Sequence, residues 1–251
     1  MTTWAILPVK PFYLGKSRLH SFLDKEEIYQ LNRDLFTSTY RRLEACHEID
    51  KILVITRDEE ILKLVDEWGG VALAENTSSS LNLAISQAFA FIQESEESGP
   101  VLVIPADLPR MKTEDLDEML ALAKENGNSH FSPRHGQETM SEREKELGSL
   151  VVSRPRIMDY FHTENCWKEN RFLVIVPDYN QTGTNALYMS RPALIKPMFG
   201  RRSFQKHIRQ ALVKSINLTV WLNNVMQYDL DTHQDLQKYN KINHNLIETI
   251  Y

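Results

Sequence analysis

Short apolar runs alternate with amphipathic stretches along the first 125 residues, and this alternation restricts the fold more than any other feature of the sequence. Four of the runs have the length and composition of buried strands: Trp4–Val9, Ile52–Thr56, Val71–Ala74 and Val101–Pro105. Strands and helices that alternate with short connections build a sheet with helices on both faces. The sequence therefore predicts an α/β fold with a largely parallel sheet.

Helix signals lie between and after these strands. Asp24, followed three residues later by Glu27, forms a capping box that begins the first helix. Further helices are expected at 58–68, at 81–92 and from Thr113, which we expect to be the N-cap.

The alternation breaks after Glu125, where residues 126–145 are polar and have no clear period. We interpret about 126–171 as an insertion within one domain that spans 1–251, because this segment is too short and polar to bury its own core. The alternation then resumes, with strands expected at 172–176, 185–189 and 219–222 and helices at 203–213 and 232–239.

The composition excludes several classes of protein. The 251 residues are 42% hydrophobic and 25% charged, and the net charge is −5 with the basic residues dispersed, which argues against a nucleic-acid partner. Cys46 and Cys166 have no disulfide-framework or zinc-site spacing. No apolar stretch approaches the roughly 18 residues of a membrane span, and no signal peptide is visible. We therefore expect a cytoplasmic protein with no membrane partner.

Basic residues follow the first expected strand, at an edge where α/β sheets bind ligands. Lys10, Lys16 and Arg18 lie within the turn 10–18 and suit the charge of a triphosphate. Gly15-Lys16-Ser17 is not a P-loop, because that motif requires glycine at position 10. A solvated basic turn without a ligand is the alternative.

Aspartates form the second group of candidates. Asp107 follows the fourth strand, and Asp229 and Asp231 alternate on an expected extended segment, so that both point to one side. Thr232 and Asp235 suffice to begin the next helix, which leaves the earlier aspartates for another role. Hard oxygen ligands indicate Mg²⁺ or Mn²⁺, whereas a turn aspartate bonded locally is the alternative for Asp107.

Two later segments have the character of anion sites. Small hydroxyl residues surround Gly183 within 181–187, which lets the backbone approach a ligand closely. Ser203 begins an expected helix beside Arg201 and Arg202, where free N–H groups attract anions. Ordinary turn and cap chemistry explains both segments equally well.

Six segments taken together resemble the 2-phospho-L-lactate guanylyltransferase family, which acts in the synthesis of coenzyme F-420. They are PVKPFYLGKSRL at 8–19, SLNLAI at 80–85, PADLP at 105–109, TGTNAL at 182–187, FGRRSFQKH at 199–207 and DLDTHQDL at 229–236. Their order and spacing match over nearly the whole chain, except at 126–171, a segment that the typical shorter member lacks.

The resemblance implies a Rossmann-like nucleotidyltransferase fold of the nucleotide-diphospho-sugar transferase type, with a central mixed, mostly parallel sheet. It implies a reaction that joins GTP to a small phosphorylated acid and releases pyrophosphate. The acceptor would be 2-phospho-L-lactate, phosphoenolpyruvate or 3-phospho-D-glycerate. Family members also make a homodimer plausible.

The resemblance assigns roles by position. The triphosphate would be held by Lys10, Lys16 and Arg18, and the guanosine would lie near Thr56, Asp58, Ser80, Asn82, Pro105 and Ala106. The metal ligands would be Asp107, Asp229 and Asp231, and the acceptor would be bound by Thr182, Thr184, Gly200 and Ser203. Catalysis would rest on Lys16, Arg18 and Asp107. His207 would be structural or orient the acceptor.

Three alternatives remain open. The chain could be a related nucleotidyltransferase that uses CTP or a sugar phosphate. It could be a nucleotide-binding regulator without catalysis, although a pure binder has little need for three metal carboxylates. It could also be an interaction protein built around the insertion, whose Tyr160, Phe161 and Trp167 could form an interface or a lid.

Overall fold

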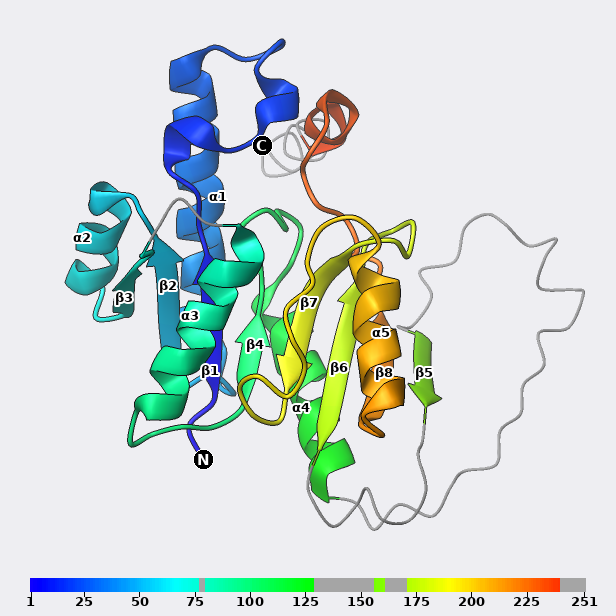
Figure 1. The fold of residues 1–251 in the computed structure, drawn as a ribbon. Helices are drawn as coiled ribbons and strands as arrows, with labels where there is room; N and C mark the ends of the chain where they lie inside the picture. The colour runs from blue at the N-terminus through cyan, green and yellow to red at the C-terminus, as the bar shows by residue number, and fades with distance from the viewer. Residues whose placement is uncertain (77–79, 129–155, 161–170, 240–251) are drawn as a thin grey trace, which may run out of the picture.

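The computed structural model describes residues 1–76, 80–128, 156–160 and 171–239. Within these residues, eight strands form one sheet in the order β3-β2-β1-β4-β7-β6-β8-β5 (Figure 1). The strands are β1 (Trp4–Pro8), β2 (Lys51–Thr56), β3 (Val71–Ala74), β4 (Val101–Val103), β5 (Arg156–Tyr160), β6 (Phe172–Pro177), β7 (Thr184–Met189) and β8 (Asn217–Leu222).

The sheet is mixed and mostly parallel, as the sequence predicts. Strands β3, β2, β1 and β4 are parallel neighbours. Strand β7 runs antiparallel to both β4 and β6, so β6 points the same way as β4, and β8 pairs with β6 in parallel. The carboxyl ends of β1, β2, β3, β4, β6 and β8 therefore meet at one edge, where β7 begins.

Helices cover both faces of this sheet. They are α1 (Lys25–Ala45), α2 (Glu59–Glu67), α3 (Leu81–Glu94), α4 (Thr113–Asn128) and α5 (Ser203–Val213), with 3-10 turns η1 (Phe12–Leu14) and η2 (Ser17–Leu19). Residues 233–239 are also helical. Helices α3 and α5 lie in front of the sheet in Figure 1, and α1 and α4 lie behind it.

The core consists of two apolar layers, one on each side of the sheet. Ala5 and Leu7 of β1 pack with the buried residues of α1, α2 and α4, whereas Trp4 and Ile6 pack with those of α3 and α5. This is the two-residue period of a strand with both faces covered. Each fully buried aliphatic or aromatic side chain contributes about 1.5–3 kcal/mol to the stability of the fold. The two layers therefore hold the strands that they cover in fixed positions.

Most helix boundaries follow the local signals in the sequence. Asp24 and Glu27 exchange both bonds of the expected capping box, and Asp58 is the N-cap of α2. Thr113 was expected to be an N-cap but is the first residue of α4 instead. The side chain of Asp115 accepts the backbone N–H of Lys112 at 2.8 Å, which is the bond that the third helical residue makes back to the residue before the helix in a capping box.

Strand β5 lies inside the segment that we interpret as an insertion. It pairs antiparallel with β8, with Arg156 opposite Leu222 and Tyr160 opposite Leu218. The sequence did not predict this strand. Most of the expected insertion, including Leu150–Val152, Phe161, Cys166 and Trp167, lies outside the described residues.

In the part of the chain that the structure describes, we find no helix long and apolar enough to cross a lipid bilayer.

Candidate active site

A cavity of about 610 Å³ lies at the edge where the parallel strands end. This size falls within the range of small-molecule sites, about 300–1,000 Å³. Its wall includes residues that follow β1, β4 and β8, together with residues from the loop before α5. Segments far apart in the sequence meet here because the strands that precede them share one direction, as in other α/β sheets.

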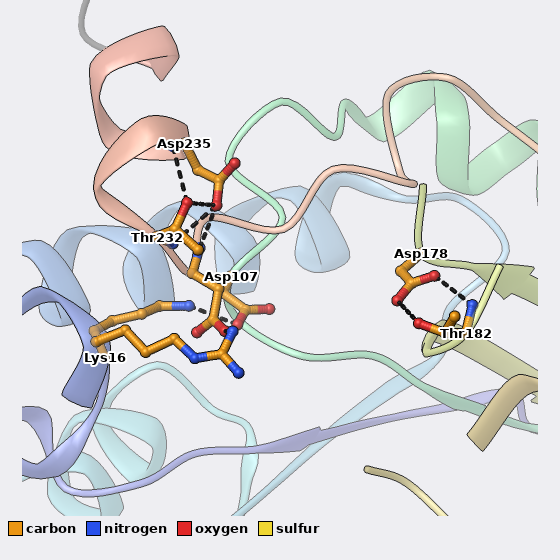
Figure 2. A network of polar contacts seen from close by, with 8 residues as sticks. Lys16, Asp107, Asp178, Thr182, Thr232 and Asp235 are labelled. Carbon is orange, nitrogen blue, oxygen red and sulfur yellow. Dashed lines mark hydrogen bonds and ion pairs between the residues drawn. The ribbon is translucent and has the colours of Figure 1, made fainter. Parts of the chain in front are cut away.

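One wall of the cavity is charged, and we call residues 10–18, 105–107 and 229–231 the ion-paired side. Lys16 Nζ lies 2.6 Å from Asp107 Oδ2, and the lysine side chain is only 7% exposed (Figure 2). Arg18 Nη1 lies 2.8 Å from Asp231 Oδ2, but its side chain is 69% exposed. The backbone N–H of Leu230 donates to the carbonyl of Asp107 at 3.0 Å, which joins the two acidic segments directly.

The carboxyl of Asp229, on the ion-paired side, has a raised pKa. Burial raises the pKa of its carboxyl to about 6, and the neighbouring carboxylates of Asp107 and Asp231 add to the shift. The three acids therefore lie close enough to repel one another. Clusters of this kind, with strongly perturbed pKa values in a cleft, are typical of functional sites.

The acidic side chains are paired with cations rather than arranged around a metal. Among the described residues, no group of three or more acidic, histidine or cysteine side chains is arranged to hold a metal ion. Lys16 and Arg18 neutralise Asp107 and Asp231 instead. The donor set nevertheless fits a hard divalent cation, since carboxylate oxygens are its preferred ligands and Asp229, among the residues that the structure describes, forms no ion pair with a cationic side chain.

The opposite wall is held by hydrogen bonds, and we call residues 178–184 and 198–207 the turn side. The carboxylate of Asp178 accepts the backbone N–H groups of Thr182 at 2.7 Å and Gly183 at 2.8 Å, and the Thr182 hydroxyl at 2.9 Å (Figure 2). A Cβ on Gly183 would lie 2.8 Å from Asp178 Oδ2, so only glycine lets the turn close on this carboxylate.

His207 lies beneath the turn side and is fully buried. Its Nδ1 lies 3.0 Å from the Thr184 hydroxyl, and its Nε2 accepts the backbone N–H of Met198 at 3.0 Å. Burial, and to a lesser extent the charge of Lys206, lowers the pKa of His207 to about 4. The ring is therefore neutral at pH 7 and unsuited to act as a proton carrier there.

Left-handed backbone recurs around the cavity. Lys16, Gln181 and Arg202 have φ values of 54°, 53° and 57°, and Gly200 has φ of 104°. For a residue other than glycine, this conformation costs about 1 kcal/mol or more. Strained backbone of this kind persists only where the surrounding contacts compensate for its cost. Here it occurs in loops on both sides of the cavity.

The structure brings most of the predicted site residues to one cavity. Those in its wall are Lys10, Lys16, Ser80, Pro105, Ala106, Asp107, Thr184, Gly200, Ser203, Asp229 and Asp231. Arg18 is outside the wall but is ion-paired to Asp231, which is in it. The grouping agrees with the sequence prediction, whereas the individual ligand roles stay predictions.

The other predicted contacts have local partners instead of positions in the wall. Thr56 is fully buried, and its hydroxyl accepts the N–H of Asp58, the N-cap of α2. Thr182 bonds to Asp178. Asn82 binds the backbone of Phe199 at both ends of its amide, with 2.7 Å to the N–H and 3.1 Å to the carbonyl. Asn82 thus joins α3 to the turn side.

Sequence reasoning missed several polar residues of the wall: Arg57, Glu75, Asp178 and Asn185. Arg57, Glu75 and Asp178 each come directly after a strand that ends at the cavity edge. The rule that led to Asp107 therefore applied equally to these three. Asn185 is the second residue of β7, and its amide donates to the carbonyl of Met226 at 2.9 Å.

Solved structures with the same arrangement are nucleotide-transferring enzymes. A Desulfovibrio desulfuricans protein, provisionally named a nucleotide-diphospho-sugar transferase, matches with a TM-score of 0.62 at 13% identity, covering 94% of this chain and 85% of that one. A nucleotidyl transferase from Methanothermobacter matches with a TM-score of 0.56 at 9% identity, covering 99% of both chains. Both likenesses show that the chain has the fold of these enzymes.

The sequence comparisons give the family. The model of the family described as "Guanylyl transferase CofC like" matches residues 3–140 and 140–240, so the chain belongs to this family. A 2-phospho-L-lactate guanylyltransferase from Methanocaldococcus sp. is 25% identical, covering 92% of this chain and 78% of the relative. A phosphoenolpyruvate guanylyltransferase from Sphaerobacter thermophilus is 24% identical, covering 95% of this chain and 92% of the relative.

Proposed function

We propose that this enzyme joins GTP to a small phosphorylated acid and releases pyrophosphate, as a step in coenzyme F-420 synthesis. The observation that carries the proposal is the division of one cavity into a side where cations pair with carboxylates and a side where the one carboxylate, Asp178, is bonded within its own turn beside the Thr184 hydroxyl. A nucleoside triphosphate with its metal suits the first side, and a small anion suits the second. Relatives named as guanylyltransferases for 2-phospho-L-lactate and phosphoenolpyruvate support this choice.

The proposed chemistry is a single in-line displacement. An oxygen of the acceptor phosphate forms a bond to the α-phosphorus of GTP, and the bond from that phosphorus to the bridging oxygen breaks. The electron pair of the broken bond leaves with pyrophosphate. No enzyme nucleophile is needed, since a phosphate monoester is largely ionised at pH 7, so catalysis depends on positioning and charge neutralisation.

The cations of the ion-paired side suit the leaving group. The ammonium of Lys16 is nearly buried, so its position is fixed by the surrounding protein and its charge is weakly screened. The guanidinium of Arg18 is exposed and can turn toward an arriving ligand. Together with Lys10, these groups would neutralise the triphosphate and the charge that develops on pyrophosphate.

Asp107, Asp229 and Asp231 would hold Mg²⁺ or Mn²⁺. When bound, the metal supplies positive charge that offsets the repulsion between two anionic substrates. The aspartates would hold it, and its charge would relieve the repulsion among them that contributes to the raised pKa of Asp229. Asp107 and Asp231 would exchange their pairing with Lys16 and Arg18 for the metal, which releases both cations toward phosphate oxygens.

The remaining walls would bind the nucleoside and the acceptor. Ser80, Pro105 and Ala106 line the cavity near the ends of the parallel strands and would contact the guanosine. Thr184, Gly200 and Ser203 line the turn side and would contact the acceptor. Ser203 is the first residue of α5, and the positive end of that helix favours an anion, although the N–H groups of Ser203 and Phe204 already donate to the carbonyls of Gly200 and Thr182.

Pyrophosphate release from the purified protein with Mg²⁺ tests the proposal. Each of the four nucleoside triphosphates is combined with 2-phospho-L-lactate, phosphoenolpyruvate and 3-phospho-D-glycerate. Release with GTP and one acid, dependent on the metal, supports the proposal and names the acceptor. Release with CTP instead of GTP would replace it with the related nucleotidyltransferase. A folded protein that releases no pyrophosphate in any combination would favour a non-catalytic nucleotide binder.

We further propose that the enzyme is a cytoplasmic homodimer. Family resemblance supports the dimer, and the absence of a disulfide pattern around its two cysteines supports a reducing compartment. Light scattering at several concentrations tests the first, since a monomeric mass throughout contradicts it. Cell fractionation tests the second.

A further inference from the structure

One imidazole ring connects two separate parts of the turn side. His207 comes from α5, yet its two nitrogens contact the start of β7 through Thr184 and the loop before α5 through Met198. The ring itself is fully buried, so it does not contact a ligand in the cavity. Thr184 is 8% exposed and lies in the cavity wall. The histidine is therefore one step removed from the acceptor.

The bond to Met198 determines the position of the proton on this ring. A backbone N–H only donates, so Nε2 of His207 must accept and carries no proton. A protonated Nε2 would place two donors 3.0 Å apart. The neutral ring therefore carries its proton on Nδ1. This agrees with the burial that keeps His207 uncharged at pH 7.

This tautomer also fixes the role of the Thr184 hydroxyl. Since Nδ1–H donates to Oγ1 of Thr184, the threonine must direct its own O–H proton elsewhere. Among the residues that the structure describes, no other side chain or carbonyl accepts that proton. The hydroxyl is thus presented as a donor, in a wall that faces the cavity. An anionic oxygen is the partner that such a donor favours.

We propose that His207 is a positioning residue that makes the Thr184 hydroxyl a hydrogen-bond donor to an anionic oxygen of the acceptor. The inference rests on the proposed function and adds to it the residue that sets the polarity of the acceptor side. The same ring holds the loop beside Gly200 through Met198, and Asn82 holds the next residue, Phe199. The acceptor side is therefore organised before the acceptor arrives.

Two substitutions separate the two bonds of the ring. In His207→Gln, the amide oxygen reaches the place of Nε2 and keeps the Met198 bond, but the donor to Thr184 is lost. In His207→Asn, the amide nitrogen takes the place of Nδ1 and keeps the donor to Thr184. Thr184→Val removes the hydroxyl with little change of volume. His47→Gln is the matched control, because the His47 side chain is 90% exposed and remote from the cavity.

Steady-state pyrophosphate release then gives kcat and both KM values for every variant. For His207→Gln and Thr184→Val we expect the KM of the acceptor to rise roughly tenfold, the size of one hydrogen bond to a charged group, with the KM of GTP unchanged. His207→Asn should keep the acceptor KM within about threefold of the wild type. The double variant His207→Gln/Thr184→Val should be no worse than Thr184→Val alone, since both changes remove the same bond.

Other patterns overturn the inference. Effects of His207→Gln and Thr184→Val that multiply in the double variant would show that the two residues act separately. An equal rise in the KM of GTP, or equal losses in the Gln and Asn variants, would reduce His207 to a packing role. These results require an active wild type, so they leave the proposed function intact. A wild type that is folded but inactive with every acid would defeat the proposed function and this inference together.

Discussion

The two sides of the cavity reach a stable arrangement by different means. On the ion-paired side, the carboxylates of Asp107 and Asp231 are neutralised by Lys16 and Arg18, partners that a ligand must displace. On the turn side, Asp178 and His207 bond to groups of the protein that a ligand can leave in place. One side must therefore rearrange when substrates bind, whereas the other is organised beforehand.

This difference assigns separate energetic roles to the two sides. When a charged side chain gives up one partner for a ligand, binding gains only the difference in free energy between the new interaction and the one that is lost. Donors that are already fixed cost no reorganisation when the ligand arrives. We therefore expect substitutions on the ion-paired side to affect turnover and metal use, and substitutions on the turn side to affect the acceptor alone.

The largest effect should come from Asp107→Asn. Asp107 is a proposed metal ligand that also positions the ammonium of Lys16, so its loss weakens metal binding and leaves Lys16 without that partner. We expect kcat to fall by about a thousandfold or more, the scale of losing an electrostatic group at the reacting centre. Circular dichroism should stay unchanged. Normal turnover with an unchanged Mg²⁺ requirement would remove Asp107 from the site and end the contrast between the sides.

Next in size is a stability effect that is specific to His207. Its pKa is lowered from 6.5 to about 4 in the folded protein, so the unfolded chain binds more protons between these values. Stability is therefore full above about pH 6.5 and is lost as the pH falls toward 4. Between pH 7.5 and pH 5 this group should cost the folded state about 2 kcal/mol.

The measurement is the unfolding free energy in guanidinium at both pH values, for the wild type and His207→Asn. The variant should lose about 2 kcal/mol less than the wild type over this interval. Taking the difference cancels the opposite contribution of Asp229, whose raised pKa stabilises the folded state as the pH falls. Equal losses in both proteins would mean that His207 titrates normally and that the turn side is less rigid than its contacts indicate.

A smaller effect, confined to the acceptor, should follow Asp178→Asn. The amide offers one acceptor oxygen where the carboxylate offers two, and its NH₂ group opposes the N–H donors of Thr182 and Gly183. We expect the acceptor KM to rise roughly tenfold with the KM of GTP unchanged. Asp66→Asn, an exposed change on α2, is the control. A matching rise in the KM of GTP would show that the two sides are not independent.

The fold follows from the sequence because its signals are local. The apolar run that predicts β1 and the capping box of Asp24 and Glu27 each depend on a few neighbouring residues, and both the strand and the capping box are present in the structure. Residues after the strands were expected to converge because parallel strands end at one edge, and the cavity wall confirms this for Lys16 and Asp107. The hydrophobic pattern, and the position of a residue directly after a strand, were enough to predict these parts of the molecule.

What the sequence did not predict depends on long-range pairing. Strand β5 is recognised by its partner β8, which lies some 60 residues further along the chain. Asp178 follows an expected strand and was open to prediction for that reason, but its place at the cavity also requires β6 to run parallel to β4, which follows from the antiparallel pairing of both with β7. The sequence predicts that His207 is structural or orients the acceptor, but its bonds to Thr184 and Met198 join segments that only the folded chain brings together.

The smallest effect should come from Arg18→Gln, and it sharpens the comparison within the ion-paired side itself. The Arg18 side chain is 69% exposed, so its pairing with Asp231 is screened by water and salt, unlike that of the nearly buried Lys16. Exposed pairs of this kind contribute about 0–1 kcal/mol, so the unfolding free energy should hardly change. The KM of GTP should rise about threefold in low salt and less in high salt. Arg18→Lys, which keeps the charge, should stay close to the wild type. A rise in the KM of GTP that is large and independent of salt would instead show that Arg18 is held as firmly against its ligand as Lys16 is against Asp107. In that case, the exposure of Arg18 in the ligand-free protein would not indicate its role in the reaction.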